Sequence, residues 1–329
     1  MAFKRTRTAL VAFVLLALLA VVYFYFSLYP ALPALPKQIY YKLGVCTHGN
    51  VSSELKALHS GIRYFRTDIS LGKSQESWLA YEHSTFNASY LGILDYDTLP
   101  GGFSNKNWNL TEWNESVANA LQAYPWINTW EIWNEPYVGM FQTGFVNGSA
   151  YNYFLLLKSA AKIIRSREPN ATVVCFGGAP IGNEQIFNWY AQVWRYGAAE
   201  YCNAISLHAY LLGPLLPYEN FTKSWSSSIE AYETLTGKPI YITEFGMPSS
   251  SAMPGYSQKM QNQFLVESLS LFNRFSYIKR AYWYDLWGLS DGSLRDDFGL
   301  LNLSNPYTGT PSISWYTFLQ ASNRRAYTK

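Results

Sequence analysis

Short apolar segments alternate along this chain with longer segments in which apolar residues recur every three or four positions. The first kind is typical of buried strands and the second of amphipathic helices. Strands are predicted at Tyr41–Cys46, Gly61–Arg66, Leu91–Tyr96, Thr129–Trp133, Thr172–Phe176, Ala204–Leu207, Ile240–Thr243 and Arg280–Tyr284. Helices are predicted at Ser52–Ser60, Gln75–Glu82, Glu112–Ala123, Tyr151–Ser166, Glu184–Tyr196, Ser226–Thr236, Gln258–Phe275 and Ser312–Ala321. Eight alternating pairs predict an α/β fold, a single (β/α)8 TIM barrel spanning residues 37–329.

The first 36 residues have a different composition from the rest of the chain. Residues 1–8 are basic, and the stretch from Ala9 to Phe26 carries no charge. An apolar run of this length can span a bilayer, and the basic side stays in the cytoplasm. We therefore expect a transmembrane signal anchor at residues 9–29, a Pro-rich spacer at 30–36 and a catalytic body outside the cell. A cleaved signal peptide remains the alternative.

Acceptor motifs for N-glycosylation support an external location. Eight asparagines each precede a residue and then Ser or Thr, namely Asn50, Asn87, Asn109, Asn114, Asn147, Asn170, Asn220 and Asn302. Glycans are added to such motifs in secreted or surface-exposed domains. Most of these motifs fall in predicted loops or helix ends, where a glycan would not collide with the core.

Composition excludes several function classes. The 329 residues carry a net charge of +3, which gives no reason to expect nucleic acid. The three cysteines, Cys46, Cys175 and Cys202, lack metal-ligand spacing and allow at most one bridge in a monomer. His48, His83 and His208 are too scattered to indicate a metal site, so neither metal nor cofactor is predicted. No G-x-S-x-G or phosphate-binding glycine loop supports esterase or nucleotide chemistry.

Two predicted strands end in a glutamate. The stretch from Asn128 to Pro136 closes with Trp133, Asn134, Glu135 and a proline that turns the chain into a loop. The stretch from Pro239 to Gly246 ends in Thr243, Glu244, an aromatic residue and a glycine. If strands alternate with helices, about three βα units separate the two glutamates. Two carboxyl groups facing one pocket are the arrangement that glycoside hydrolysis requires.

These two motifs resemble those of the clan A glycoside hydrolases, which include cellulases, β-mannanases and β-xylosidases. The resemblance extends more weakly over about Tyr41 to Leu319 and implies a retaining (β/α)8 enzyme. It implies Glu135 as the acid/base, Glu244 as the nucleophile and Asn134 as a partner of the sugar 2-hydroxyl. Arg66, at the end of the second predicted strand, would keep Glu244 ionised, because a nearby cation favours a carboxylate.

Other polar residues recur at predicted strand ends, where a barrel of this kind places its active site. By the same resemblance, His208 and Tyr210 are expected beside the nucleophile. Trp283 is expected to form the platform beneath the sugar whose bond is cleaved. Asp68 and Asp95 would bind a hydroxyl or pair with Arg66. Glu131 lies deeper in its strand and is expected to be structural.

Three hypotheses follow for the function. The first is a membrane-anchored retaining β-glycoside hydrolase that acts on an extracellular poly- or oligosaccharide. The second is a transglycosylase on the same scaffold. The third is a catalytically silent barrel that binds surface glycan, although such a protein needs neither Glu135 nor Glu244. The expected partners are a carbohydrate substrate and the membrane, with no obligate protein partner.

Overall fold

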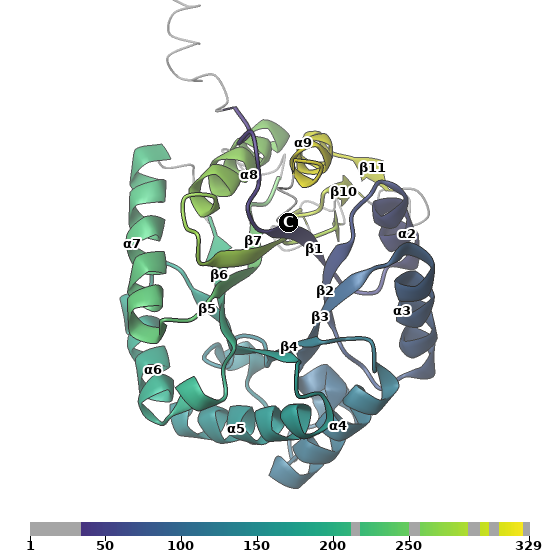
Figure 1. Ribbon diagram of the computed structural model, residues 1–329, viewed down its shortest axis with the longest axis vertical. Coiled ribbons are helices and arrows are strands. Elements are labelled where there is room, and N and C mark those ends of the chain that lie inside the picture. The colour runs from purple at the N-terminus through teal and green to yellow at the C-terminus, as the bar shows by residue number, and fades with distance from the viewer. Residues whose placement is uncertain (1–33, 212–217, 250–256, 289–296, 303–308, 325–329) are drawn as a thin grey trace, which may run out of the picture. The chain divides into compact units, whose positions relative to one another are not determined.

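The computed structural model describes residues 34–211, 218–249, 257–288, 297–302 and 309–324. Leu35–Lys329 forms one compact unit built on a closed barrel in which each strand pairs in parallel with the next and β8 closes on β1. The strands are β1 (Lys42–Thr47), β2 (Tyr64–Asp68), β3 (Ser89–Leu94), β4 (Thr129–Ile132), β5 (Thr172–Pro180), β6 (Ala204–Tyr210), β7 (Ile240–Gly246) and β8 (Ile278–Trp283). Figure 1 shows them as an inner ring. The predicted (β/α)8 barrel is therefore confirmed.

Helices surround this ring of strands (Figure 1). They are α2 (Val51–His59), α3 (Lys73–Phe86), α4 (Leu110–Ala123), α5 (Ala150–Arg167), α6 (Glu184–Arg195), α7 (Tyr218–Thr236), α8 (Gln258–Phe272) and α9 (Ile313–Ser322). Local sequence fixes where several begin. Asn109 and Glu112 form a capping box at the start of α4, and the Ser149 side chain accepts a hydrogen bond from Asn152 N at the start of α5.

Both faces of the barrel strands are buried, as expected for a parallel sheet covered by helices. One small cluster fills the barrel interior and comprises Cys46, Leu91, Val174, Ala204, Tyr241 and Tyr282. The larger core lies between the strands and the helices and includes Trp113, Trp130 and Trp283. Because the strands are apolar on both faces, apolar content alone does not reveal which side chains point inward.

The predicted boundaries differ from the structure in a few places. Helix α7 begins at Tyr218, about two turns before the predicted Ser226. Its buried residues Phe221, Trp225, Ile229 and Tyr232 recur at helical spacing, so one apolar stripe runs through both parts. A small additional sheet joins β9 (Trp287–Gly288), β10 (Leu301–Asn302) and β11 (Thr310–Pro311), none of which the pattern predicted.

The structure also bears on the predicted surroundings of the domain. The expected membrane segment at residues 9–29 lies outside the described residues, and no helix from Ala34 onward within them is long and apolar enough to cross a membrane.

Cys175 and Cys202 form a disulfide, and Cys46 is a buried free thiol. Of the seven glycosylation-motif asparagines with described side chains, four are exposed and three partly exposed: Asn87, Asn109, Asn147 and Asn170, then Asn50, Asn114 and Asn302.

Candidate active site

Glu244 lies near the carboxyl end of β7 and is held from two sides. Arg66, on β2, donates from Nη1 to Glu244 Oε1 at 2.5 Å. The Tyr210 hydroxyl, at the end of β6, donates to Oε2 of the same carboxylate. Parallel strands bring their carboxyl ends to one mouth, so residues far apart in sequence meet here. The expected proximity of Arg66 and Tyr210 to Glu244 is confirmed.

Glu135 is placed by an unusual backbone just beyond β4. Trp133 has φ of 67° and Glu135 has φ of 44°, in the left-handed region that most side chains avoid. The Glu135 backbone N–H donates to Gly177 O at 2.6 Å, in an irregular part of β5 where the pairing register with β6 shifts. A Cβ on Gly177 would overlap the Trp133 carbonyl, so the close approach of β4 and β5 requires glycine there.

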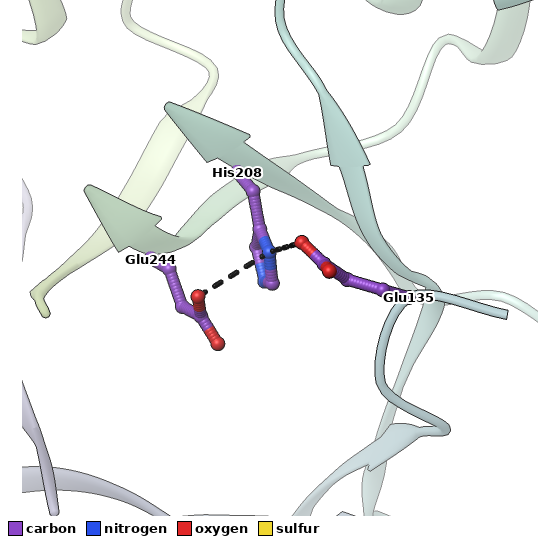
Figure 2. Close-up of side chains that lie close together, drawn as sticks. All are labelled: Glu135, His208 and Glu244. Atoms are coloured by element: carbon purple, nitrogen blue, oxygen red, sulfur yellow. Dashed lines mark hydrogen bonds and ion pairs between the residues drawn. The ribbon is translucent and has the colours of Figure 1, made fainter. Parts of the chain in front are cut away.

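His208 lies between the two glutamates, as Figure 2 shows. Its Nδ1 is 2.8 Å from Glu135 Oε1 and 3.4 Å from Glu244 Oε2. A ring nitrogen and one oxygen from each carboxylate all lie within 4.8 Å of one another. Gly178 leaves room for the imidazole, because a Cβ there would overlap the ring. The sequence-predicted pair Glu135 and Glu244 is thus brought together, with His208 between them.

The charges around Glu244 favour its ionised form. Burial alone would raise the pKa of Glu244, but the charges of His208 and Arg66 and the Tyr210 hydrogen bond lower it below its ordinary value. The same contacts favour the charged form of His208. Burial alone would lower the pKa of the imidazole, but Glu244 and Glu135 raise it above its ordinary value. A nucleophilic carboxylate requires this kind of environment.

Arg66 connects the catalytic pair to the barrel interior. Its Nε donates to Glu131 Oε2 at 2.6 Å, and its Nη2 donates to Asn134 Oδ1 at 3.1 Å. Glu131 is fully buried below the mouth, as its depth in β4 predicted. Asn134 is positioned beside the nucleophile through Arg66. The guanidinium therefore holds three polar groups at once and is itself only 2% exposed.

A second polar group lies beside the first, at the ends of β1, β2 and β3. His48 Nδ1 is 3.3 Å from Asp68 Oδ2, and His48 Nε2 is 3.8 Å from Asp285 Oδ2. Burial opposes the charge of His48, yet Asp68 and the other nearby carboxylates raise its pKa to about 9. His48 was not among the predicted site residues, although its place at a strand end was the available signal.

Asp95 and Asp97 complete this second group. Asp68, Asp95 and Asp97 each offer a carboxylate oxygen within 4.8 Å of the other two. Asp95 is fully buried, and within the described residues its Oδ2 has no hydrogen-bond partner. The expected pairing of Asp68 or Asp95 with Arg66 is absent from the described contacts, because Glu131, Glu244 and Asn134 occupy the guanidinium.

The prediction that Trp283 floors the sugar is wrong for this structure. Its side chain is 0% exposed, packs on Phe245 and Phe264, and donates from Nε1 to Phe298 O. Strand alternation turns Trp283 toward the helices and its neighbours toward the barrel. Tyr284, one position later, instead contacts the rings of Tyr210 and His48 at the mouth.

Two groups of described side chains have the composition of a metal site. One is the trio Glu135, His208 and Glu244, and the other is Asp68, Asp95 and Asp97. In the first group His208 Nδ1 is hydrogen-bonded to Glu135 and lies 3.4 Å from Glu244, which matches a proton-transfer site. The second group offers oxygen ligands alone, which suit only hard cations.

An eight-stranded barrel with two close carboxylates at its mouth is the arrangement that glycoside hydrolases use. A family model described as "Glycosyl hydrolase catalytic core" matches residues 65–316. The chain belongs to this family and is a glycoside hydrolase, which confirms the resemblance to clan A. The chain matches no curated protein sequence.

Solved structures with the same fold include a family 39 glycoside hydrolase from Bacteroides cellulosilyticus WH2. It is 16% identical, has a TM-score of 0.62, and is matched over 89% of this chain and 65% of its own. A β-D-glucuronidase from Dictyoglomus thermophilum is 11% identical with a TM-score of 0.60, over 88% and 53%. A β-glucuronidase from Bacteroides uniformis is 14% identical with a TM-score of 0.61, over 87% and 35%. The chain thus spans between about a third and two thirds of these proteins, and the likeness concerns the fold.

Proposed function

We propose that this glycoside hydrolase cleaves β-glycosidic bonds with retention of configuration. Glu244 would be the nucleophile and Glu135 the acid/base. The observation that supports this best is that Glu135 and Glu244 oxygens lie within 4.8 Å of each other. Retaining enzymes have carboxyl groups about 5–5.5 Å apart, whereas inverting enzymes need about 6.5–9.5 Å to admit a water. The β-linkage follows from the clan resemblance and from structural neighbours named as β-glucuronidases.

In the first step Glu244 attacks the anomeric carbon while Glu135 gives its proton to the departing oxygen. The negative charge leaves Glu244, which becomes an ester, and appears on Glu135. His208 contacts both groups through Nδ1. The imidazole therefore faces one carboxylate charge before and after the step, which limits the electrostatic rearrangement that the reaction requires.

In the second step Glu135 takes a proton from water, and the resulting hydroxide displaces Glu244 from the sugar. Arg66 and Tyr210 then stabilise the returning Glu244 carboxylate through the hydrogen bonds already described. Asn134, oriented by Arg66, is the group we assign to the sugar 2-hydroxyl, an interaction that strengthens in the transition state.

The test compares Glu135→Gln and Glu244→Gln on an aryl glycoside with a good leaving group. Glu244→Gln should lose activity on every substrate, because no ester can form. Glu135→Gln should retain the first step, accumulate the glycosyl-enzyme, and turn over faster with azide to give a β-glycosyl azide. Azide rescue of Glu244→Gln instead would reverse the assignment, and full activity of both variants would place the active site elsewhere.

Transglycosylation is the second candidate, because the same intermediate reacts with a sugar hydroxyl instead of water. The length of products formed from a β-linked oligosaccharide distinguishes the two, since a transglycosylase makes products longer than the substrate. A non-catalytic glycan-binding role would leave substrate length unchanged.

We further propose that the catalytic domain lies outside the cell, retained by the basic and apolar residues 1–29. Exposure of most of the described glycosylation asparagines agrees with this placement. Protease added to intact cells should remove the domain, and deglycosylation should lower its mass toward the 37.5 kDa of the chain. Protection of the domain until lysis would reverse the orientation, and a mature N-terminus after residue 29 would indicate a cleaved signal peptide.

A further inference from the structure

We infer that the sugar bound at Glu244 is uncharged, and that the enzyme rejects uronic acids. This inference rests on the proposed function and names the substrate class of the same site. Its basis is the distribution of charge around Glu244. Arg66, His208 and His48 are each paired with a protein carboxylate, and the wall formed by the ends of β2 and β3 has more carboxylates than cations.

The cations of the site are engaged by protein carboxylates. Arg66 bonds to both Glu131 and Glu244 and has 2% of its side chain exposed. His208 bonds to Glu135 and faces Glu244, with 1% exposed. A uronate would have to displace one of these carboxylates from a buried cation, and a buried charge left unpaired is costly. His208 Nε2 makes no hydrogen bond among the described residues, but the atom is buried, so a substrate carboxylate would reach either cation only by displacing a glutamate.

The adjacent wall carries more negative than positive charge. Asp68, Asp95 and Asp97 have oxygens within 4.8 Å of one another, and His48 is the described cation in contact with them. The crowding is reflected in their protonation. Burial and repulsion from Asp68 raise the pKa of Asp97 to about 6, and burial with repulsion from Asp68 and Asp97 raises the pKa of Asp95 well above its usual range, so Asp68 and Asp97 supply the negative charge of the wall at neutral pH. A further carboxylate at this wall would be repelled.

This wall lies next to the place where the sugar must sit. Asp68 follows Arg66 by two positions on β2, so both point to the same face and Asp68 is nearer the mouth. His48, paired with Asp68, also contacts the ring of Tyr284, which packs on Tyr210 beside Glu244. The sugar that becomes linked to Glu244 therefore has this wall as a neighbour.

One exposed cation offers a competing interpretation. Lys106, in the segment after β3, places Nζ 3.7 Å from the centre of the Phe103 ring. Phe103 in turn packs on Tyr96, next to Asp95. If a uronate were the substrate, Lys106 would be the described residue with a free ammonium in this region. The experiment below includes Lys106→Gln for this reason.

The experiment uses pairs of ligands that differ only in a carboxylate. Binding of glucono-1,5-lactone and glucaro-1,5-lactone is measured by calorimetry, and kcat/KM is measured for aryl β-glucoside and β-glucuronide, with the corresponding galacto pair of glycosides. All solutions contain EDTA, so that no divalent cation neutralises the aspartates. In every pair for which binding or turnover is detected, the neutral ligand should have an affinity or a kcat/KM at least tenfold higher than the uronate.

A charge-neutralising variant tests the cause. Asp97→Asn keeps the side-chain shape and removes one negative charge. A like charge about 7 Å away changes affinity by roughly 3- to 50-fold between water-like and surface-like dielectric constants. The ratio of uronate to neutral-sugar binding should improve by a factor in that range. Glu115→Gln, at an exposed position of α4, removes the same charge elsewhere and should leave the ratio unchanged.

The salt dependence gives a measurement that needs no variant. Raising the salt to 1 M shortens the screening length to about 3 Å, which should favour the uronate member selectively. Preference of the wild-type enzyme for any uronate member would overturn the inference, and loss of that preference in Lys106→Gln would assign the uronate to Lys106. An unchanged ratio in Asp97→Asn would also overturn it. Failure of every pair to bind or react would count against the proposed function itself and would remove the inference with it.

Discussion

Two pairs of buried glutamates in this molecule differ in whether a cation contacts them. Glu131 and Glu244 share Arg66 inside the barrel. Glu54 and Glu82 meet between α2 and α3, where Thr47, Trp78 and Tyr90 supply neutral hydrogen bonds and no described cation makes contact. All four glutamates are almost completely buried, so burial is not what distinguishes the pairs.

The difference lies in the counter-ion. Burial raises the pKa of Glu82, repulsion from Glu54 raises it further, and the value reaches about 8. Burial acts on Glu244 in the same direction, but the charges of His208 and Arg66 outweigh it and the pKa falls. The comparison teaches that nearby cations keep the buried Glu244 ionised and able to act as a nucleophile. Neutral hydrogen bonds alone leave the buried Glu82 with a raised pKa, so it holds its proton.

The largest effect is expected from removing that cation. Arg66→Met leaves Glu131 without its counter-ion and leaves Glu244 with His208 alone, and breaking a buried ion pair in this way costs about 3–5 kcal/mol. Denaturant unfolding should show this loss, and kcat/KM should fall about a thousandfold, because the pKa of the nucleophile rises and a donor to its carboxylate is lost.

Adding Glu131→Gln to Arg66→Met separates the structural from the catalytic part of this effect. The double variant removes one of the stranded charges, so it should be more stable than Arg66→Met alone while remaining inactive. Equal stability of the single and double variants would show that Glu131 holds no charge in the folded protein, and the comparison between the two pairs would fail.

A smaller effect is expected from removing one hydrogen bond to the nucleophile. Tyr210→Phe keeps the ring and deletes the hydroxyl that donates to Glu244. A hydrogen bond to a charged group is worth about 1.5–3 kcal/mol, so kcat/KM should fall by roughly 10- to 150-fold. Since the hydroxyl lowers the pKa of Glu244, its loss should move the acid limb of the kcat/KM profile to higher pH.

Tyr232→Phe is the matched control for this measurement. Tyr232 lies on α7, and its hydroxyl donates only to Pro180 O at 3.4 Å among the described contacts. Its acid limb should coincide with that of the wild-type enzyme. An unmoved acid limb in Tyr210→Phe would mean that Arg66 and His208 alone set the ionisation of Glu244.

The strand pattern predicted the barrel, and the resemblance to clan A placed Arg66 and Tyr210 beside Glu244; the structure explains both in the same way. Parallel strands must place their carboxyl ends at one mouth, so polar residues at strand ends converge whatever their separation in the chain. The exact position of Glu135 could not be predicted in the same way. Positive φ values at Trp133 and Glu135 break the alternation of the strand, so counting by twos no longer gives the side-chain direction.

The error at Trp283 has a different origin. Both faces of β8 are aromatic and buried, with Tyr282 inside the barrel and Trp283 against the helices. When one face is polar, the pattern fixes the register, but two apolar faces leave a one-residue ambiguity that reverses every side chain. Trp283→Ala should therefore cost about 3–5 kcal/mol of folding stability, as for a buried aromatic side chain, instead of acting mainly on catalysis.

The smallest effect concerns the pair without a cation. Glu82 has a folded-state pKa of about 8, above its ordinary value of 4.5, so the protonated form is the one that folding favours. Its contribution to stability is fully present below pH 4.5 and is lost as pH rises through about 8. Glu82→Gln keeps an oxygen to accept from Tyr90 and provides an N–H toward Glu54 without a charge. Relative to wild type, the variant should melt several degrees higher at pH 8.5 and much closer to wild type at pH 5.

Glu54→Gln provides the contrast that makes this measurement decisive. Glu54 accepts from both the Thr47 hydroxyl and Trp78 Nε1, so an amide there replaces one acceptor by a donor facing another donor. It should lower the melting temperature at both pH values, because a buried donor is left unpaired. If Glu82→Gln behaves in the same way, losing stability equally at pH 5 and pH 8.5, then Glu82 is ionised in the folded protein. Neutral hydrogen bonds would then suffice to hold a buried carboxylate, and Arg66 would not be what separates the catalytic pair from the structural one.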